Sequence, residues 1–141
     1  MTPISFDLDP RLANDTAWLR DWPLCKLLLM NDQRYSWIVL VPRRTGVTEP
    51  FDLKPADQTR LWHEVMHAAE ILKAASPCRK VNIGALGNIV SQLHVHIVAR
   101  NEGDFAWPGP VWGQGIALRF EPASLEARLE AFRNTLHPPA D

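Results

Sequence analysis

The chain has 141 residues, of which 46% are hydrophobic and 22% charged, and its formal net charge at pH 7 is −1. These values are typical of one globular domain, here residues 1–141, and they argue against disorder, a fibrous architecture and a large binding surface for nucleic acid. The longest aliphatic run, Leu27–Met30, is far shorter than the roughly 20 apolar residues that span a membrane.

The first half of the chain predicts a hairpin of two buried strands. The opening residues, MTPISFDLDPR, have no basic segment followed by an apolar one, so we expect no signal peptide and a cytoplasmic location. The opening of the chain, which includes Trp18, Trp22 and Pro23, is expected to be irregular. The apolar runs 24–30 and 37–41 read as strands, and the polar residues between them form the connection.

A long helix and two further strands follow. Pro55 suits the first turn of a helix, and apolar residues then recur at helical spacing until Ser76 and Pro77 end it. The segments 80–87 and 92–100 read as strands around a turn at Gly87 and Asn88.

The last third contains a proline-rich and tryptophan-rich loop, residues 104–115, and then a possible fifth strand at 116–120 and a final helix. Apolar residues at helical spacing mark that helix: Leu125, Leu129, Phe132 and Leu136. This order predicts an α+β fold, in which an antiparallel sheet of about five strands packs against a long central helix and a C-terminal helix.

Two histidine pairs are candidate sites. His63 and His67 belong to HEVMH, which matches the H-E-x-x-H pattern of zinc hydrolases, but they lie opposite the apolar face of the predicted helix and no third ligand is evident. We therefore expect a solvated helix face, with a zinc hydrolase as a remote alternative and no metal site.

The second pair lies in SQLHVHIVAR, residues 91–100. The two-residue period of a strand directs Gln92, His94 and His96 to one face and the aliphatic residues between them to the other. Three aligned polar side chains in an aliphatic strand are costly to bury without a function. The preceding GALGN can bring backbone amides close to an anion, and local arginines such as Arg34, Arg43, Arg44 and Arg100 allow a small anionic ligand.

QLHVHIVAR resembles the histidine-triad motif, His-φ-His-φ-His-φ-φ, where φ is apolar. The segments LLLMNDQRYSWIVLVPRR, FDLKPADQTRLWHEV and ALGN resemble the hairpin, helix and glycine turn of the same family, and DFAWPGPVWG is similar to a bacterial subgroup of histidine-triad hydrolases. The resemblance implies a homodimer that binds nucleotides or dinucleoside polyphosphates such as diadenosine tetraphosphate, with no tightly bound cofactor and, at most, magnesium that accompanies the substrate.

The resemblance also implies roles for individual residues. His94, at the middle position, would attack the α-phosphate and form a nucleotidyl-histidine, which a neutral imidazole nitrogen can do near pH 7. His96 would hydrogen-bond the phosphate and assist proton or charge transfer. The nucleotide-binding candidates are Asn31 for the ribose, and Asn82, Gly87 and Asn88 near the phosphates.

The chain departs from the family pattern at three positions. Gln92 replaces the first triad histidine, Trp37 stands where several branches carry a histidine, and Ile89 stands where some carry a hydroxyl residue. The expected activity is hydrolysis or nucleotidyl transfer at the α-phosphate of dinucleoside polyphosphates or nucleoside phosphoramidates. The alternative is a nucleotide-binding module with little catalysis. The loop 104–115 could be a lid over the leaving group, or it could cover a sheet edge or a dimer interface.

Overall fold

The computed structural model describes residues 6–140; residues 1–5, part of the segment used to argue against a signal peptide, and residue 141 lie outside the described residues. Within residues 6–140 the chain forms a five-stranded sheet, three α-helices and a short 3₁₀ helix. In chain order the elements are α1 (Pro10–Asp15), β1 (Thr16–Asp21), β2 (Cys25–Met30), β3 (Ser36–Pro42), η1 (Pro50–Asp52), α2 (Pro55–Ala75), β4 (Lys80–Gly84), β5 (Val95–Arg100) and α3 (Pro122–Arg133).

The sheet is antiparallel throughout, in the order β1-β2-β3-β5-β4. This confirms the predicted α+β fold. In the β3–β5 pairing Val39 lies opposite His96 and Trp37 opposite Val98, so Trp37 is a diagonal neighbour of His96. The register therefore brings a tryptophan of the hairpin beside a histidine about sixty residues later in the chain.

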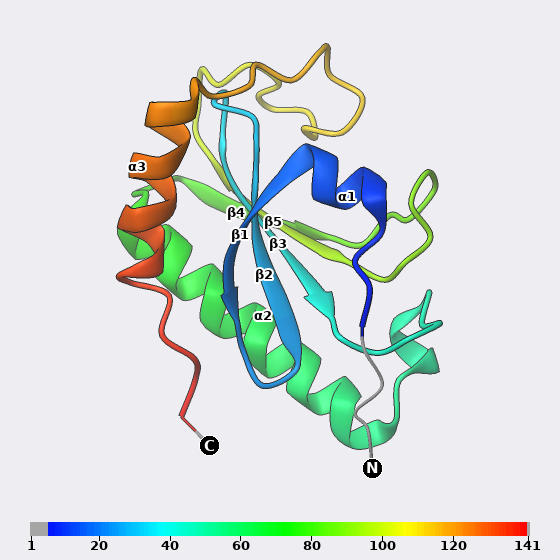
Figure 1. The fold of residues 1–141 in the computed structure, drawn as a ribbon. Helices are drawn as coiled ribbons and strands as arrows, with labels where there is room; N and C mark the ends of the chain where they lie inside the picture. The colour runs from blue at the N-terminus through cyan, green and yellow to red at the C-terminus, as the bar shows by residue number, and fades with distance from the viewer. Residues whose placement is uncertain (1–5, 141) are drawn as a thin grey trace.

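Both faces of the sheet are covered, and each has its own hydrophobic core. On one face, alternate residues of β2, β3 and β5 pack against α2 and α3. On the other face, the intervening strand residues pack against Leu12 of α1, Val90 and Val111. Figure 1 shows α2 and α3 on one side of the sheet and α1 on the other. The polar residues that form the site described below lie on the α1 side.

The sequence-based assignments hold for most elements. The helix at 55–75, the hairpin and the β4–β5 pair are confirmed, with β4 ending at Gly84 and β5 beginning at Val95. The prediction of a strand at 116–120 was wrong, because those residues run beside the β2–β3 turn without joining the sheet; Gln33 N–H donates to the Leu118 carbonyl and Phe120 N–H to the Asn31 side chain. The fifth strand is β1 instead.

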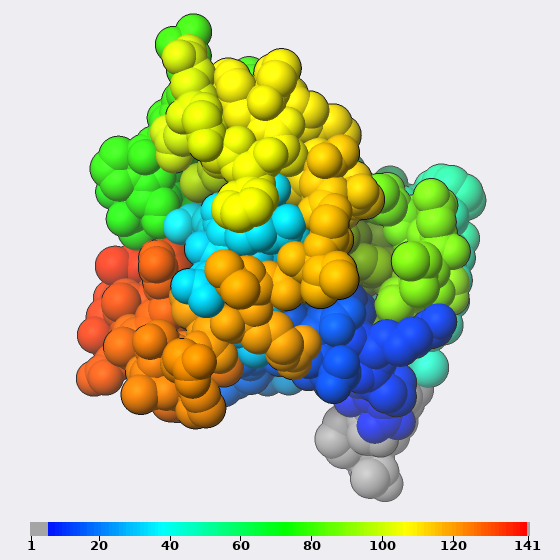
Figure 2. Space-filling view, turned by 90° about the horizontal axis from the view of Figure 1, so that it is seen from above, coloured from blue at the N-terminus to red at the C-terminus, as the bar shows by residue number. Residues whose placement is uncertain are grey.

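The segment 101–120 extends across one end of the molecule. Figure 2 shows it, in yellow to orange, around the blue-cyan residues of the β2–β3 turn. Arg100 holds its first half: this side chain is 1% exposed, forms two hydrogen bonds to Asp104 at 2.9 and 3.0 Å, and donates to the Gly109 carbonyl and to Asn82 Oδ1. Arg100 thus ties the first half of this segment to β4 and β5. No helix among residues 6–140 has the length and apolar character needed to cross a membrane.

Candidate functional site

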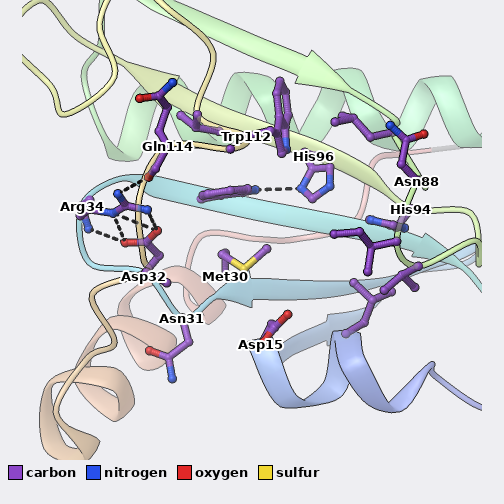
Figure 3. Close-up of a pocket in the computed structure, with 18 of the residues that line it drawn as sticks. Asp15, Met30, Asn31, Asp32, Arg34, Asn88, His94, His96, Trp112 and Gln114 are labelled. Atoms are coloured by element: carbon purple, nitrogen blue, oxygen red, sulfur yellow. Dashed lines mark hydrogen bonds and ion pairs between the residues drawn. The ribbon is translucent and has the colours of Figure 1, made fainter.

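A pocket of about 630 Å³ lies on the α1 side of the sheet. Its lining residues come from α1, from the end of β2 and the turn that follows, from Trp37 of β3, from residues 86–90, from the start of β5 and from residues 111–119. Figure 3 shows His94 and His96 at one end of the pocket and the pair formed by Asp32 and Arg34 at the other. The pocket therefore has two imidazole rings at one end and an ion pair at the other.

His94 lies just before β5 and presents one ring nitrogen as an unprotonated base. Its Nδ1 is 2.7 Å from the Gln92 carbonyl oxygen, which can only accept a hydrogen bond, so Nδ1 carries the proton. A neutral imidazole has one proton, and therefore the lone pair lies on Nε2. His94 is 6% exposed, and its ring centroid is 4.8 Å from that of His96.

His96, on β5, has the opposite arrangement. Trp37 Nε1 lies 3.0 Å from His96 Nδ1, the dashed line that ends on His96 in Figure 3. An indole N–H can only donate, so Nδ1 accepts and the proton of the neutral ring lies on Nε2. Burial, reinforced by the nearby His94 ring, lowers the pKa of His96 to about 3. At neutral pH His96 is therefore an uncharged hydrogen-bond donor.

Trp112 closes this end of the pocket. Its ring centroid lies 5.4 Å from that of His96 and 6.5 Å from that of Trp37. A Cβ atom at Gly84 would come within 3.0 Å of the Trp112 ring, so the strand needs glycine there for the tryptophan to pack on it. Among the described residues, Trp112 Nε1 has no hydrogen-bond partner although it is buried. The protein thus leaves a donor unmatched in a residue that lines the pocket.

The far end of the pocket is held by an ion pair. Arg34 contacts Asp32 through Nε and Nη2, with Nη2 at 2.8 Å, and also donates to the Gln114 carbonyl. Burial raises the pKa of Asp32, but hydrogen bonds from Arg34 outweigh it and keep the pKa below its usual value. The Asp32 carboxylate also accepts from Leu118 N–H, and therefore the pair ties the β2–β3 turn to the segment 114–118.

The arginines considered for an anionic ligand are already paired with carboxylates. Arg34 is held by Asp32, Arg100 by Asp104, Arg44 by Asp57 at 2.7 Å, and Arg43 lies 3.9 Å from Asp21. Of these four, Arg34 lines the pocket. A phosphate would thus meet neutral donors near the histidines rather than an arginine cluster.

Most of the predicted site residues line one pocket: His94, His96, Asn31, Gly87 and Asn88. Gly87 has a φ of +74°, which forms the predicted turn before Asn88. Asn31 Oδ1 accepts from Phe120 N–H at 2.9 Å, which orients the side chain and leaves its amide N–H groups for a ligand.

Gln92 and Asn82 lie outside the pocket. The expected strand begins only at Val95, and the Gln92 side chain does not join the two histidines in the pocket lining. The Gln92 amide instead accepts from Asp9 N–H at 2.8 Å and donates to the Asp7 carbonyl at 2.9 Å, which fastens the chain before α1. Asn82 Oδ1 accepts from Arg100 at 2.8 Å.

The HEVMH segment has a structural role in α2. Glu64 is fully buried, and its carboxylate accepts from Leu24 N–H at 3.0 Å and from Cys25 N–H at 2.8 Å. His67 Nε2 is 3.0 Å from the His137 carbonyl, and its ring packs on Trp22. The glutamate that a zinc hydrolase would use as a base is therefore committed to the β1–β2 turn. Within residues 6–140 no group of three or more His, Cys, Asp or Glu side chains is placed to hold a metal ion.

Several pocket residues were not identified from the sequence as ligand contacts. They include Leu12, Asp15, Val111 and Arg119. The apolar ones look like ordinary core residues in a single sequence, and the charged ones like ordinary surface residues. Only the tryptophans of the segment 104–115 gave a signal, since large aromatic rings beside prolines suggest a rigid surface.

Comparisons with known proteins agree with this geometry. A family model described as HIT domain matches residues 11–103. A histidine-triad protein from Sinorhizobium meliloti is 46% identical, with a TM-score of 0.89 over 93% of this chain and 97% of the other. One from Bradyrhizobium japonicum is 41% identical, with a TM-score of 0.90 over 95% and 100% of the two chains. One from Marinobacter aquaeolei is 39% identical, with a TM-score of 0.91 over 94% and 96%. A search of the curated proteins finds no match.

Proposed function

The chain belongs to the histidine-triad (HIT) family, and from this premise we propose that it is a nucleotide hydrolase or nucleotidyl transferase. His94 attacks the α-phosphorus of a bound nucleotide derivative and forms a nucleotidyl-histidine. Water or another acceptor then releases the nucleotide. The substrate class comprises dinucleoside polyphosphates and nucleoside phosphoramidates.

The main support for the proposal is the tautomer and orientation of the His94 ring. The Gln92 carbonyl orients the ring through Nδ1, so that the lone pair of Nε2 belongs to a side chain that lines the pocket. As Nε2 bonds to phosphorus, positive charge develops on the ring, and the Nδ1 proton donated to a carbonyl stabilises that charge. An oriented neutral imidazole of this kind is suited to nucleophilic attack near pH 7.

Neutral donors support the developing charge on the phosphate. His96 carries its proton on Nε2, and Asn88 and the backbone after Gly87 line the same end of the pocket. Fixed donors of this kind stabilise a transition state without reorganising. Met30, Leu12 and Val111 supply an apolar wall for the base, and the amide nitrogen of Asn31 is a candidate for the ribose.

A nucleotide-binding module with little catalysis is the second candidate. It is favoured by one observation: Gln92, at the first triad position, is engaged by Asp7 and Asp9 and lies outside the pocket. Calorimetry would then show nucleotide binding while phosphorus NMR shows intact ligand for hours. Rapid cleavage of the same ligand would exclude this candidate.

The test of the proposed activity is the kinetics of His94→Ala with a matched His63→Ala control. His63 is exposed on α2 and lies away from this pocket. Loss of the nucleophile should reduce kcat by about 1000-fold or more, whereas the control should retain wild-type rates. Full turnover by His94→Ala on every nucleotide that the wild type cleaves would overturn the assignment.

The homodimer and the magnesium ion bound to the substrate's phosphates remain predictions. Sedimentation equilibrium measures the first: a mass near twice the 16.0 kDa of one chain is expected. Turnover with and without a chelator measures the second.

A further inference from the structure

The contact between Trp37 and His96 bears on which bond the proposed enzyme can break. Trp37 is 6% exposed and His96 5%, so the 3.0 Å hydrogen bond between them is sheltered from water. Because Trp37 has a donor and no acceptor, it favours one protonation state of its partner: a neutral ring with an unprotonated Nδ1. A histidine in the place of Trp37 could either donate or accept and would impose no such choice.

A second proton on His96 would be opposed from several sides. On Nδ1 it would face the Trp37 N–H across 3.0 Å, so that two donors would point at each other. The rings of Trp37, Trp112 and His94, whose centroids lie 4.8 to 5.6 Å from that of His96, surround the imidazole and exclude the water that would solvate its charged form. Burial among these rings lowers the pKa of His96 to about 3. Loss of the remaining Nε2 proton would leave an imidazolate, which is equally unfavourable near neutral pH.

The other polar groups in and around the pocket are held by partners of their own. Asp32 is bound by Arg34, and the hydrogen bonds of that pair, acting against burial, hold its pKa below its usual value. Asp15 lies 4.0 Å from the guanidinium of Arg119. Gln92, the neutral amide at the first triad position, is fastened to the backbone of Asp7 and Asp9. The proton on His94 is donated to a carbonyl.

From this arrangement we infer that Trp37 is a positioning residue, which keeps His96 a hydrogen-bond donor and prevents it from acting as a proton-transferring acid. The substrates are therefore phosphoanhydrides rather than phosphoramidates. The inference rests on the proposed function and selects one of its two substrate classes. On this inference the Trp37 side chain determines which leaving groups the site can release.

The bond chemistry gives the reason. The Nε2 lone pair of His94 forms a bond to the α-phosphorus, the bond from phosphorus to the leaving atom breaks, and its electron pair departs on that atom. In a phosphoanhydride the leaving atom is an oxygen of a phosphate, which is stable as an anion and needs no proton. In a phosphoramidate it is an amine nitrogen, which has to be protonated as it leaves. Water then attacks phosphorus, the pair of the P–N bond returns to Nε2, and the proton of the water passes to solvent.

To test the inference, kcat/KM is measured for two substrates that share the adenosine 5′-phosphoryl group. Diadenosine tetraphosphate offers an oxygen leaving group, and an alkyl amine phosphoramidate of adenosine offers nitrogen. General acid catalysis contributes about 100-fold to 10,000-fold, so kcat/KM should favour the anhydride by at least about 100-fold. Equal values would overturn the inference and leave the proposed function intact. Cleavage of neither substrate would instead remove the proposed function, and this inference with it.

Variants and NMR test the role of Trp37 itself. Trp37→Phe keeps a ring and removes the N–H, and Trp37→His supplies a partner that can donate or accept. In both variants the kcat/KM values for the anhydride and the phosphoramidate should lie closer together than in the wild type. Nitrogen chemical shifts of His96 in the wild type provide a readout that does not depend on turnover or on the stability of a variant. They should show a protonated Nε2 and a bare Nδ1 from pH 5 to 8. An imidazolium at His96 within that range would contradict the inference.

Discussion

His94 and His96 are two residues apart and carry opposite tautomers, because each ring meets a partner of fixed polarity. A backbone carbonyl accepts from Nδ1 of His94, and an indole N–H donates to Nδ1 of His96. The result is one histidine with an unprotonated Nε2 and one with a protonated Nε2, both lining the same pocket. The sequence predicts that the two histidines share one face, but it cannot show their tautomers, because the hydrogen-bond partners are the Gln92 carbonyl and Trp37 of β3.

The lowered pKa of His96 predicts a loss of stability in acid. The unfolded chain binds a proton at the ordinary pKa of 6.5, whereas the folded protein binds it only near 3. The unfolded state therefore holds more protons between these values, and the free energy of unfolding falls by up to about 1.4 kcal/mol for each pH unit as the pH drops below 6.5.

Urea titrations from pH 7 to about pH 4.5 measure this slope, above the range in which most carboxylates titrate. The matched variant is His96→Asn, which keeps a polar side chain of similar size and cannot titrate. It should have a distinctly smaller slope than the wild type. Identical slopes for the two proteins would show that His96 does not carry the effect.

At the scale of elements, hydrophobic periodicity predicts those strands and helices whose buried faces follow a regular period. The helix at 55–75 and the hairpin are of this kind. β1 is different, because its register against β2 shifts between Trp18 and Arg20 and only Leu19 is fully buried. A bulged edge strand with one buried residue gives no two-residue pattern to detect. Residues 116–120 show the reverse case, because their apolar run resembles a strand although the segment does not join the sheet.

The anchoring of the segment 101–115 by Arg100 can be tested against a neighbouring ion pair. Arg100 and Asp104 are nearly buried, whereas Arg79 and Glu102 form a pair whose side chains are 67% and 63% exposed. Arg100→Ala should lower the free energy of unfolding by about 3 to 5 kcal/mol, because the carboxylate of Asp104, the Gly109 carbonyl and Asn82 all lose a donor. Arg79→Ala should change it by no more than about 1 kcal/mol. Chemical denaturation of both variants checks this, and equal losses would contradict the anchoring role.

The glutamate of HEVMH offers a second test at this scale. Glu64→Gln retains one acceptor and turns an NH₂ group toward a backbone N–H of Leu24 or Cys25, which should cost about 1 to 3 kcal/mol of stability. Glu70→Gln, on an exposed position of the same helix, should stay within about 0.5 kcal/mol of the wild type. Thermal unfolding measures both, and nucleotide cleavage should persist in both. A folded Glu64→Gln protein that has lost all activity would argue for a catalytic role.

At the scale of the whole molecule, the pocket exists because segments distant in sequence converge on one face of the sheet. Gln92 holds the chain before α1 from more than eighty residues away, and Arg34 reaches Gln114 from the β2–β3 turn. The sequence motif indicated the candidate histidines, the glycine turn and Asn88, which are close together along the chain. It could not indicate that Leu12, Asp15 and Arg119 complete the wall, because that depends on the packing of the whole fold.

A pocket assembled from so many segments should stabilise the fold when it is occupied. A nucleoside monophosphate at about 100 times its Kd should add about 2.7 kcal/mol to the free energy of unfolding, because it binds only the folded state. Thermal unfolding with increasing ligand measures this, and inorganic phosphate at the same concentration is the control for a purely ionic effect. Equal stabilisation by phosphate and nucleotide would mean that the apolar wall contributes nothing to recognition.

Intact-protein mass spectrometry can detect nucleotidyl transfer to His94 itself. The wild type and His94→Ala are mixed with diadenosine tetraphosphate and quenched rapidly in alkali, since acid hydrolyses the phosphorus–nitrogen bond. We expect an added mass of one adenylyl group on the wild type and none on the variant. Turnover by the wild type with no adduct at any time point, or an adduct that persists in His94→Ala, would contradict it.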